Sequence, residues 1–247
     1  MTDWSQLSDA YGSAERIPLL LDRVGIEEGV WDELWGRLCH QGVTAYSASF
    51  AALPSLAAVA RSAEDRDSNE ALLLAGSIMR CALQGHGADD ILLSSSTAVE
   101  DLRDLADKRL AARPARYLEL FAVLLALDGL PLWSEVMGGF SDDFYEVACP
   151  HCAAQITVAI GDYGYYSSIR DLHDGDVDRV PLRPIGVDEL HGAGREIYDT
   201  AIRDGQNTLA EGITFLFGCA ECGGCGSVFN VAGEYAAANS PDWAGQS

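Results

Sequence analysis

The chain has 247 residues, of which 48% are hydrophobic and 22% charged. This composition is that of folded globular proteins, excludes a disordered chain, and leaves room for one large or two modest domains. Its 38 acidic residues outnumber 16 Lys and Arg, so the formal net charge is −22. Nucleic-acid binding needs Lys and Arg to replace counterions along the phosphates, so the charge argues against general DNA or RNA binding and favours a basic protein partner.

The N-terminus, which begins Met1-Thr2-Asp3, has neither a positive segment nor an apolar core typical of a signal peptide. No apolar run approaches the length needed to cross a bilayer, and we therefore expect a cytoplasmic protein without membrane contact. Seven cysteines, an odd number, favour reduced thiols and metal binding over disulfides. Cys39 and Cys81 lie in apolar helical stretches, where they are interpreted as buried, inert thiols.

The first half of the chain, to about Met137, shows the periodicity of helices. Apolar residues recur at steps of three and four, as in the stripe formed by Trp31, Leu34, Trp35 and Leu38. The pattern predicts antiparallel helical pairs, with helices at residues 17–21, 30–39, 47–60, 69–83, 98–112 and 114–127.

Short motifs in this half carry a resemblance to a known class of proteins. They are Ala10 to Ala14, Ile17-Pro18, Trp35, His40-Gln41-Gly42, Tyr46 and Ala51 to Pro54. With these motifs, residues 3–130 resemble bacterial HEAT-repeat-like proteins of the actinobacterial type. The resemblance implies a protein-binding surface rather than catalysis. Because the helical pairs are few, it implies a compact bundle and not a long solenoid.

Two cysteine pairs in the second half predict a metal site. Cys149-Pro150-His151-Cys152 and Cys222-Gly223-Gly224-Cys225 are separated by about 70 residues, and strands are expected at 144–147, 155–160, 213–217 and 228–231. This is the layout of a zinc ribbon, in which two hairpin tips hold one ion. Four thiolates at about 2.3 Å close a tetrahedron and leave no open position, so a structural zinc bound by Cys149, Cys152, Cys222 and Cys225 is predicted.

The ligand set has alternatives that the spacing leaves open. Cys219 stands three residues before Cys222, so Cys219 and Cys222 also make a valid pair, although the glycines around Cys225 favour the later pair. His151 lies within the first pair and is a possible substitute ligand. The CPHC segment also resembles the active sequence of thiol oxidoreductases, but that chemistry needs a following helix, and residues 155–160 read as a strand.

The segment between the pairs, residues 161–212, interrupts the ribbon. It contains an aromatic turn at 161–166, an acidic loop at 171–178 with His173, and a predicted helix at 188–204 that begins at Asp188 and contains His191. The tail after Glu234 is expected to be loosely docked. The predicted domains are a helical domain at 1–140, a zinc-ribbon domain at 141–235 and a flexible tail at 236–247.

The predicted fold class is therefore a mainly α, HEAT-like N-terminal domain followed by a small α+β zinc-ribbon domain. The predicted function is a non-enzymatic protein-interaction module, such as an acidic immunity-type protein that occludes a basic nuclease toxin. The alternative is an enzyme whose site lies in the insertion, around Tyr165, His173 and His191. A nucleic-acid adapter is a third hypothesis, but Arg179, Arg183 and Arg195 are too few among aspartates to support it.

Overall fold

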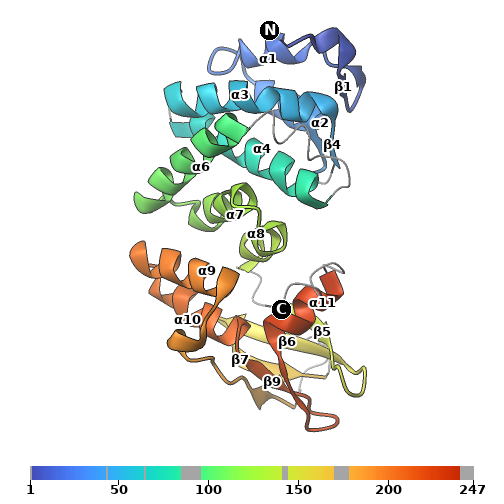
Figure 1. Cartoon of the computed structure of the whole chain (residues 1–247), viewed down its shortest axis with the longest axis vertical. Helices are drawn as coiled ribbons and strands as arrows, with labels where there is room; N and C mark the ends of the chain where they lie inside the picture. Colours follow the sequence, from blue (N-terminus) through green and yellow to red (C-terminus); the bar gives the residue numbers. More distant parts are fainter. Residues whose placement is uncertain are drawn as a thin grey trace. The chain divides into compact units, whose positions relative to one another are not determined.

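The chain divides into two compact units, Met1–Gly138 and Gly139–Ser247, close to the boundary expected at residue 140. We call them the helical unit and the cysteine unit (Figure 1). The computed structural model describes residues 2–42, 44–63, 65–84, 96–140, 144–169 and 178–239.

The helical unit is built from helices joined in sequence, as the periodicity predicts. They are α1 (Ile17–Leu21), α2 (Val30–Leu38), α3 (Ser47–Ser62), α4 (Asp65–Gln84), α6 (Ser96–Ala111), α7 (Tyr117–Leu127) and α8 (Pro131–Gly138). Two short strand pairs that the sequence did not predict lie among them, β1–β2 (Ser8–Asp9 and Gly12–Ser13) and β3–β4 (Cys39–His40 and Thr44–Ala45). Within the described residues, no helix combines the length and the apolar character that a membrane span requires.

Helix α7 forms the centre of the helical unit. Leu120 to Leu127 are all buried, and the helix packs against α4, α6 and α8. A helix that is apolar on every side belongs inside a core, because no face of it is suited to water. Helix α4 approaches α7 closely at Gly76, where an added Cβ would lie 2.8 Å from Val123. The core of this unit is therefore a layer of helices packed around α7.

In its described residues, the cysteine unit combines a four-stranded sheet and a short hairpin with three α-helices. The antiparallel sheet has the order β5-β6-β7-β8 (Phe144–Ala148, Gln155–Gly161, Gly164–Ser168, Val180–Pro181). The chain continues through α9 (Gly192–Arg203), α10 (Asn207–Leu216), the hairpin β9–β10 (Cys219–Glu221 and Val228–Asn230) and α11 (Val231–Asn239). Alternating burial along β5, where Tyr145 and Val147 face inward, gives the sheet one apolar face.

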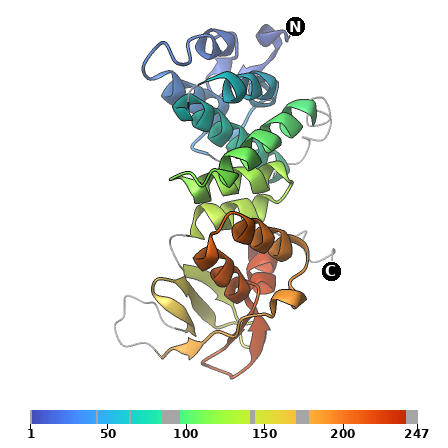
Figure 2. The ribbon, with the colours of Figure 1, turned by 90° about the vertical axis from the view of Figure 1, so that its left-hand side faces the viewer.

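Helices cover the sheet of the cysteine unit. Helices α9 and α10 lie side by side, and α10 packs on β6 (Figure 2). Their approach is close, because a Cβ added at Gly194 of α9 would lie 2.7 Å from Phe217 at the end of α10, and one added at Gly212 of α10 would lie 3.4 Å from Ile160 of β6. Helix α11 packs against β5, with the rings of Tyr145 and Tyr235 edge to face at 5.8 Å.

The strand predicted at residues 213–217 is wrong, because Ile213 to Leu216 form the last turn of α10. The run of β-branched and aromatic residues suggests a strand when read alone. Leu209, Ile213 and Leu216 nevertheless recur at helical spacing, and all three are buried. The extended segment before the second cysteine pair is instead the short strand β9.

Helix boundaries in the cysteine unit also differ from the sequence prediction. The helix expected from residue 188 begins at Gly192, after a short 3-10 turn at Val187–Glu189. Residues 236–239, assigned to a flexible tail, belong to α11, and Ala236 is fully buried. The tail prediction is therefore wrong for these four residues, because the small side chains of Ala232 and Ala236 let α11 dock.

Candidate metal centre

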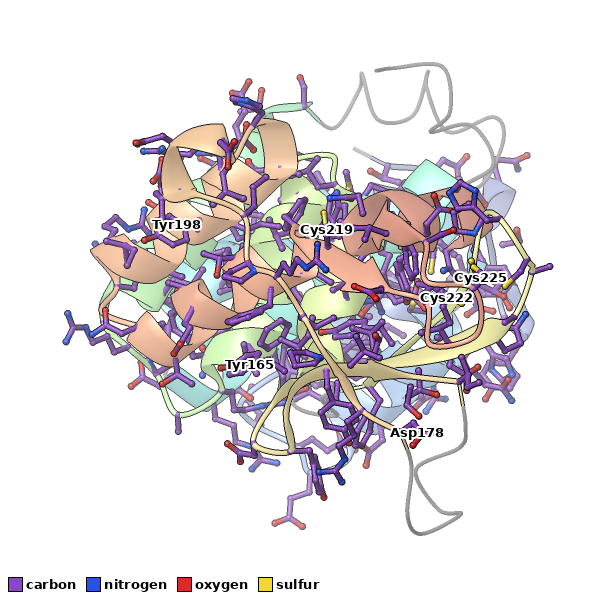
Figure 3. The ribbon with its side chains drawn as sticks, turned by 90° about the horizontal axis from the view of Figure 1, so that it is seen from below. Tyr165, Asp178, Tyr198, Cys219, Cys222 and Cys225 are labelled. Atoms are coloured by element: carbon purple, nitrogen blue, oxygen red, sulfur yellow. The ribbon has the colours of Figure 1, made fainter. Side chains whose placement is uncertain are left out.

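Two hairpin tips bring four cysteines together. Cys149 and Cys152 lie in the turn between β5 and β6, and Cys222 and Cys225 lie in the turn between β9 and β10. Their four sulfur atoms all lie within 4.8 Å of one another. Figure 3 shows Cys222 and Cys225 close together at the end of their hairpin.

The spacing of the sulfur atoms fits a tetrahedral metal ion. Four thiolates at about 2.3 Å from one ion stand about 3.8 Å apart. The distance is 3.7 Å between the sulfurs of Cys149 and Cys225, and 3.7 Å between those of Cys152 and Cys222. A disulfide would need about 2.05 Å. The four cysteines can therefore hold one metal ion without a rearrangement of the turns.

The two turns make the same backbone hydrogen bonds. The N–H of Cys149 donates to the carbonyl of Ala154, and the N–H of Ala153 donates back to the carbonyl of Cys149, each at 2.9 Å. In the second turn, Cys222 donates to Ser227 at 2.9 Å and Gly226 donates back to Cys222 at 2.8 Å. The two halves of the site are therefore structural copies, although their sequences share little beyond the cysteines.

The residue after the second cysteine of each pair adopts a left-handed backbone. Gly226 has φ +73° and Ala153 has φ +59°. This conformation is free of strain for glycine and costs about 1 kcal/mol for other residues. Gly224, which the sequence suggested as a second tight position, shows no such φ, and a Cβ there would meet only the Cys222 sulfur at 3.7 Å.

Because the two cysteine turns have equivalent backbones, Gly226→Ala and Ala153→Gly are expected to change the stability of the cysteine unit in opposite directions. Gly226→Ala is expected to destabilise the cysteine unit by about 1 kcal/mol, because the left-handed φ penalises a Cβ that otherwise meets nothing within 4 Å. Ala153→Gly is expected to stabilise it by about 0.5 kcal/mol, since relief of strain exceeds the added chain entropy. Calorimetric unfolding in excess zinc measures both. Equal signs for the two variants would contradict the equivalence of the turns.

Burial and hydrogen bonding divide the four thiols into unequal groups. Cys149 and Cys222 are buried, at 2% and 0% exposure, while Cys152 and Cys225 are exposed. The hydroxyl and the backbone N–H of Ser227 donate to the Cys225 sulfur and lower its pKa to about 6. At Cys152 a backbone hydrogen bond from Ala154 acts to lower the pKa. The hydrogen bonds to the three other thiols outweigh it, and the pKa of Cys152 is raised to about 12.

These opposed shifts reflect the crowding of four thiols that could share one cation. Four thiolates within 4.8 Å repel one another, so ionisation of one thiol disfavours ionisation of the next. A bound divalent ion removes this conflict, because it stabilises every thiolate at once. The backbone donors at Ala154 and Ser227 were not identified from the sequence. Their shared position, five residues after the first cysteine of each pair, is the signal that could have found them.

The second hairpin is anchored by contacts at its base. The Ser167 hydroxyl on β7 donates to the carbonyl of Glu221 at 2.9 Å. Cys219 exchanges two 2.9 Å backbone hydrogen bonds with Arg183, which follows β8. The carbonyl oxygen of Gly218 accepts a hydrogen bond from the N–H of Val231 at 3.1 Å. The sheet and α11 thus fix where Cys222 and Cys225 stand.

The other candidate ligands lie outside the cluster. Cys219 is on β9, paired with Asn230, and stands apart from Cys222 and Cys225 (Figure 3). His151 is exposed and is not a member of the close group. The CPHC segment joins two strands, so it lacks the helix that a thioredoxin-like site requires.

Of the residues considered for an enzyme site in the insertion, Tyr165 and His191 lie in the described part of the chain. Tyr165 stacks on Phe215 with ring centroids 4.1 Å apart, and it stands apart from Asp178 in Figure 3. His191 is exposed just before α9, and His173 lies outside the described residues. Among the described residues, the four cysteines are the one group of His, Cys, Asp or Glu that is close enough to hold a metal.

Comparisons of the chain with protein-family models, curated proteins and solved structures give no match.

Proposed function

We propose that the protein is a non-catalytic binding module for a basic protein, with a structural zinc ion in its cysteine unit. Four thiolates complete the coordination of zinc, so the ion has no open position for substrate or water. Zinc is favoured over iron because it needs no redox partner and is the usual occupant of paired cysteine turns on hairpins. The centre then serves to hold β5–β6 and β9–β10 together.

The excess of carboxylates supports a basic partner, and it is the observation on which the proposal chiefly depends. If each of the 16 Lys and Arg paired with one of the 38 acidic residues, 22 carboxylates would remain. A surface with this excess attracts cationic proteins and speeds their association. Four thiolates with one Zn²⁺ add two more negative charges, so the metal does not offset the imbalance.

A hollow in the helical unit offers a place for such a partner. It has a volume of about 460 Å³ and is lined by residues 25–32 together with Arg66 and Asp67. Glu27, Glu28 and Asp32 are exposed there, and Ile26 between them is 82% exposed. The lining carries four carboxylates and the cation Arg66, so the charges around Ile26 are mostly negative. An apolar side chain among such charges has the composition of a protein interface, where the apolar group anchors and the charges orient.

The finer form of the proposal concerns the type of binder. The HEAT-like character expected from the sequence stays a prediction, and the packed helices of the helical unit are compatible with it because repeats present extended protein-binding surfaces. An immunity-type protein that covers a basic nuclease would use its carboxylates in place of phosphates. Both parts rest on charge and on analogy of fold.

Capture of the partner tests the proposal. The tagged protein is used to retain proteins from its native cell at about 50 mM salt, and the bound fraction is eluted at about 500 mM salt, where the screening length falls several-fold. We expect one basic protein, released by salt. Retention that salt does not change, or a partner that is not basic, would contradict the proposal.

Charge-neutral variants locate the contact. Combined Glu27→Gln, Glu28→Gln and Asp32→Asn substitutions are expected to raise the Kd for the captured partner about tenfold. The control neutralises Glu100, Asp104 and Glu196, which are also exposed, and removes the same charge elsewhere. An equal loss of affinity in both variants would show that net charge, and not the hollow, determines binding.

A further inference from the structure

Two cysteines outside the metal centre meet in the helical unit. Cys39 lies on β3 and is 1% exposed, while Cys81 lies in the last turns of α4 and is partly exposed. They are 42 positions apart, yet their sulfur atoms are 3.7 Å from each other. The sequence suggested two separate inert thiols, and the structure places them in direct contact.

The surrounding backbone holds this pair in place. The turn between β3 and β4 contains Gln41 and Gly42, both with positive φ, and the N–H of Gly42 donates to the carbonyl of Cys39 at 3.0 Å. The Cys81 thiol lies beneath this turn, 3.5 Å from the Gly42 carbonyl oxygen. Helix α4 also packs against β3 and β4. Contacts from both sides therefore fix the position of each sulfur.

The two thiols have different environments. The hydrogen bond from the Cys39 thiol and the positive charge of Arg80 lower the pKa of the Cys81 thiol to about 7, although burial acts to raise it. The same hydrogen bond, followed by burial, raises the pKa of Cys39. This asymmetry is typical of a thiol pair in which one sulfur attacks and the other resolves.

We propose that Cys39 and Cys81 form a redox-active pair, in which hydrogen peroxide oxidises Cys81 and Cys39 then closes an intramolecular disulfide. The Cys81 thiolate attacks one peroxide oxygen, the O–O bond breaks, and hydroxide leaves, which gives a sulfenic acid at Cys81. The Cys39 sulfur attacks the Cys81 sulfur, its proton goes to the departing hydroxyl, and water is released. The two sulfurs lose two electrons in total, and peroxide is reduced to two molecules of water.

The geometry makes this closure accessible. A disulfide requires the sulfurs to move from 3.7 Å to about 2.05 Å, a shift of less than about 2 Å. The bond would tie the β3–β4 hairpin to the end of α4. Because both cysteines belong to the helical unit, the proposal does not depend on the metal centre or on the proposed partner.

Peptide mapping after peroxide treatment of the zinc-loaded full-length protein tests the pair. We expect a peptide joining Cys39 to Cys81, with the mass of the intact chain lowered by two hydrogen atoms and the zinc retained. In Cys39→Ala the reaction should stop at a sulfenic acid on Cys81, which dimedone traps. In Cys81→Ser no dimedone adduct should form at Cys39.

Two results would overturn the proposal. One is that Cys39 and Cys81 remain reduced under conditions in which peroxide oxidises the four-cysteine centre. The other is an equal dimedone signal at Cys39 in Cys81→Ser, which would remove the distinction between attacking and resolving thiols. Circular dichroism of each variant before oxidation establishes that it is folded, and Cys81→Ser, at a partly exposed position, keeps the test valid if Cys39→Ala does not fold.

Discussion

Replacement of Cys149 or Cys222 by Ser is expected to abolish zinc binding and to unfold the cysteine unit. Structural zinc contributes about 10–16 kcal/mol of binding free energy in small domains, which is comparable with or greater than the entire stability of a typical domain. Both thiols are buried, at 2% and 0% exposure, so a serine there leaves the remaining thiolates without a complete site. Metal analysis should find no bound zinc, and circular dichroism should show loss of helix.

The matched control for these variants is Cys219→Ser. Cys219 lies on β9 outside the close group of sulfurs, so this variant should keep one zinc per chain and its unfolding temperature should change little. The helical unit has its own core around α7 and should remain folded in all three variants. Loss of zinc in Cys219→Ser together with retention in Cys149→Ser would overturn the ligand assignment.

Gly218→Ala is expected to be the most damaging single substitution that leaves all cysteines in place. A Cβ at Gly218 would lie 2.2 Å from the carbonyl oxygen of Arg183 and 2.9 Å from that of Thr214. Both are backbone atoms held by hydrogen bonds, so neither can move without breaking the base of the β9–β10 hairpin. We expect a loss of about 3 kcal/mol or more, and a fall in Tm of more than about 10 °C.

Gly223→Ala provides the comparison for Gly218→Ala. Its Cβ would meet only Val180 and Ile169, at 3.9 Å and 4.0 Å, which is ordinary contact. Its effect should stay within about 0.5 kcal/mol, although it lies between Cys222 and Cys225. Calorimetry of both variants with zinc present decides the point, and an unchanged Tm in Gly218→Ala would contradict the close packing at the hairpin base.

The cysteine pairs were predictable because their chemistry is local. Two thiols three residues apart on a turn can reach one ion, and that requirement is visible in the spacing of residues 149–152 and 222–225. The helices around α7 were predictable for a similar reason, since a run of buried residues at helical steps needs no knowledge of its neighbours. In both cases the determining interactions span only a few positions.

The features that the sequence did not predict depend on tertiary contacts. Residues 213–217 have strand-like composition, but the burial of Ile213 and Leu216 on one helical face outweighs it. The contact between Cys39 and Cys81 depends on how α4 meets β3, across 42 positions. The matching hydrogen bonds of the two cysteine turns follow from backbone geometry that Ala153 adopts despite its Cβ.

X-ray absorption at the zinc edge of the purified protein tests the central claim most directly. We expect one zinc per chain, surrounded by four sulfur atoms at about 2.3 Å and by no nitrogen or oxygen. A nitrogen among the atoms bound to the zinc would indicate that a histidine, such as His151, takes the place of one of the four thiolates. Iron in place of zinc, or a folded cysteine unit without any metal, would contradict the assignment of the four cysteines as a structural zinc site.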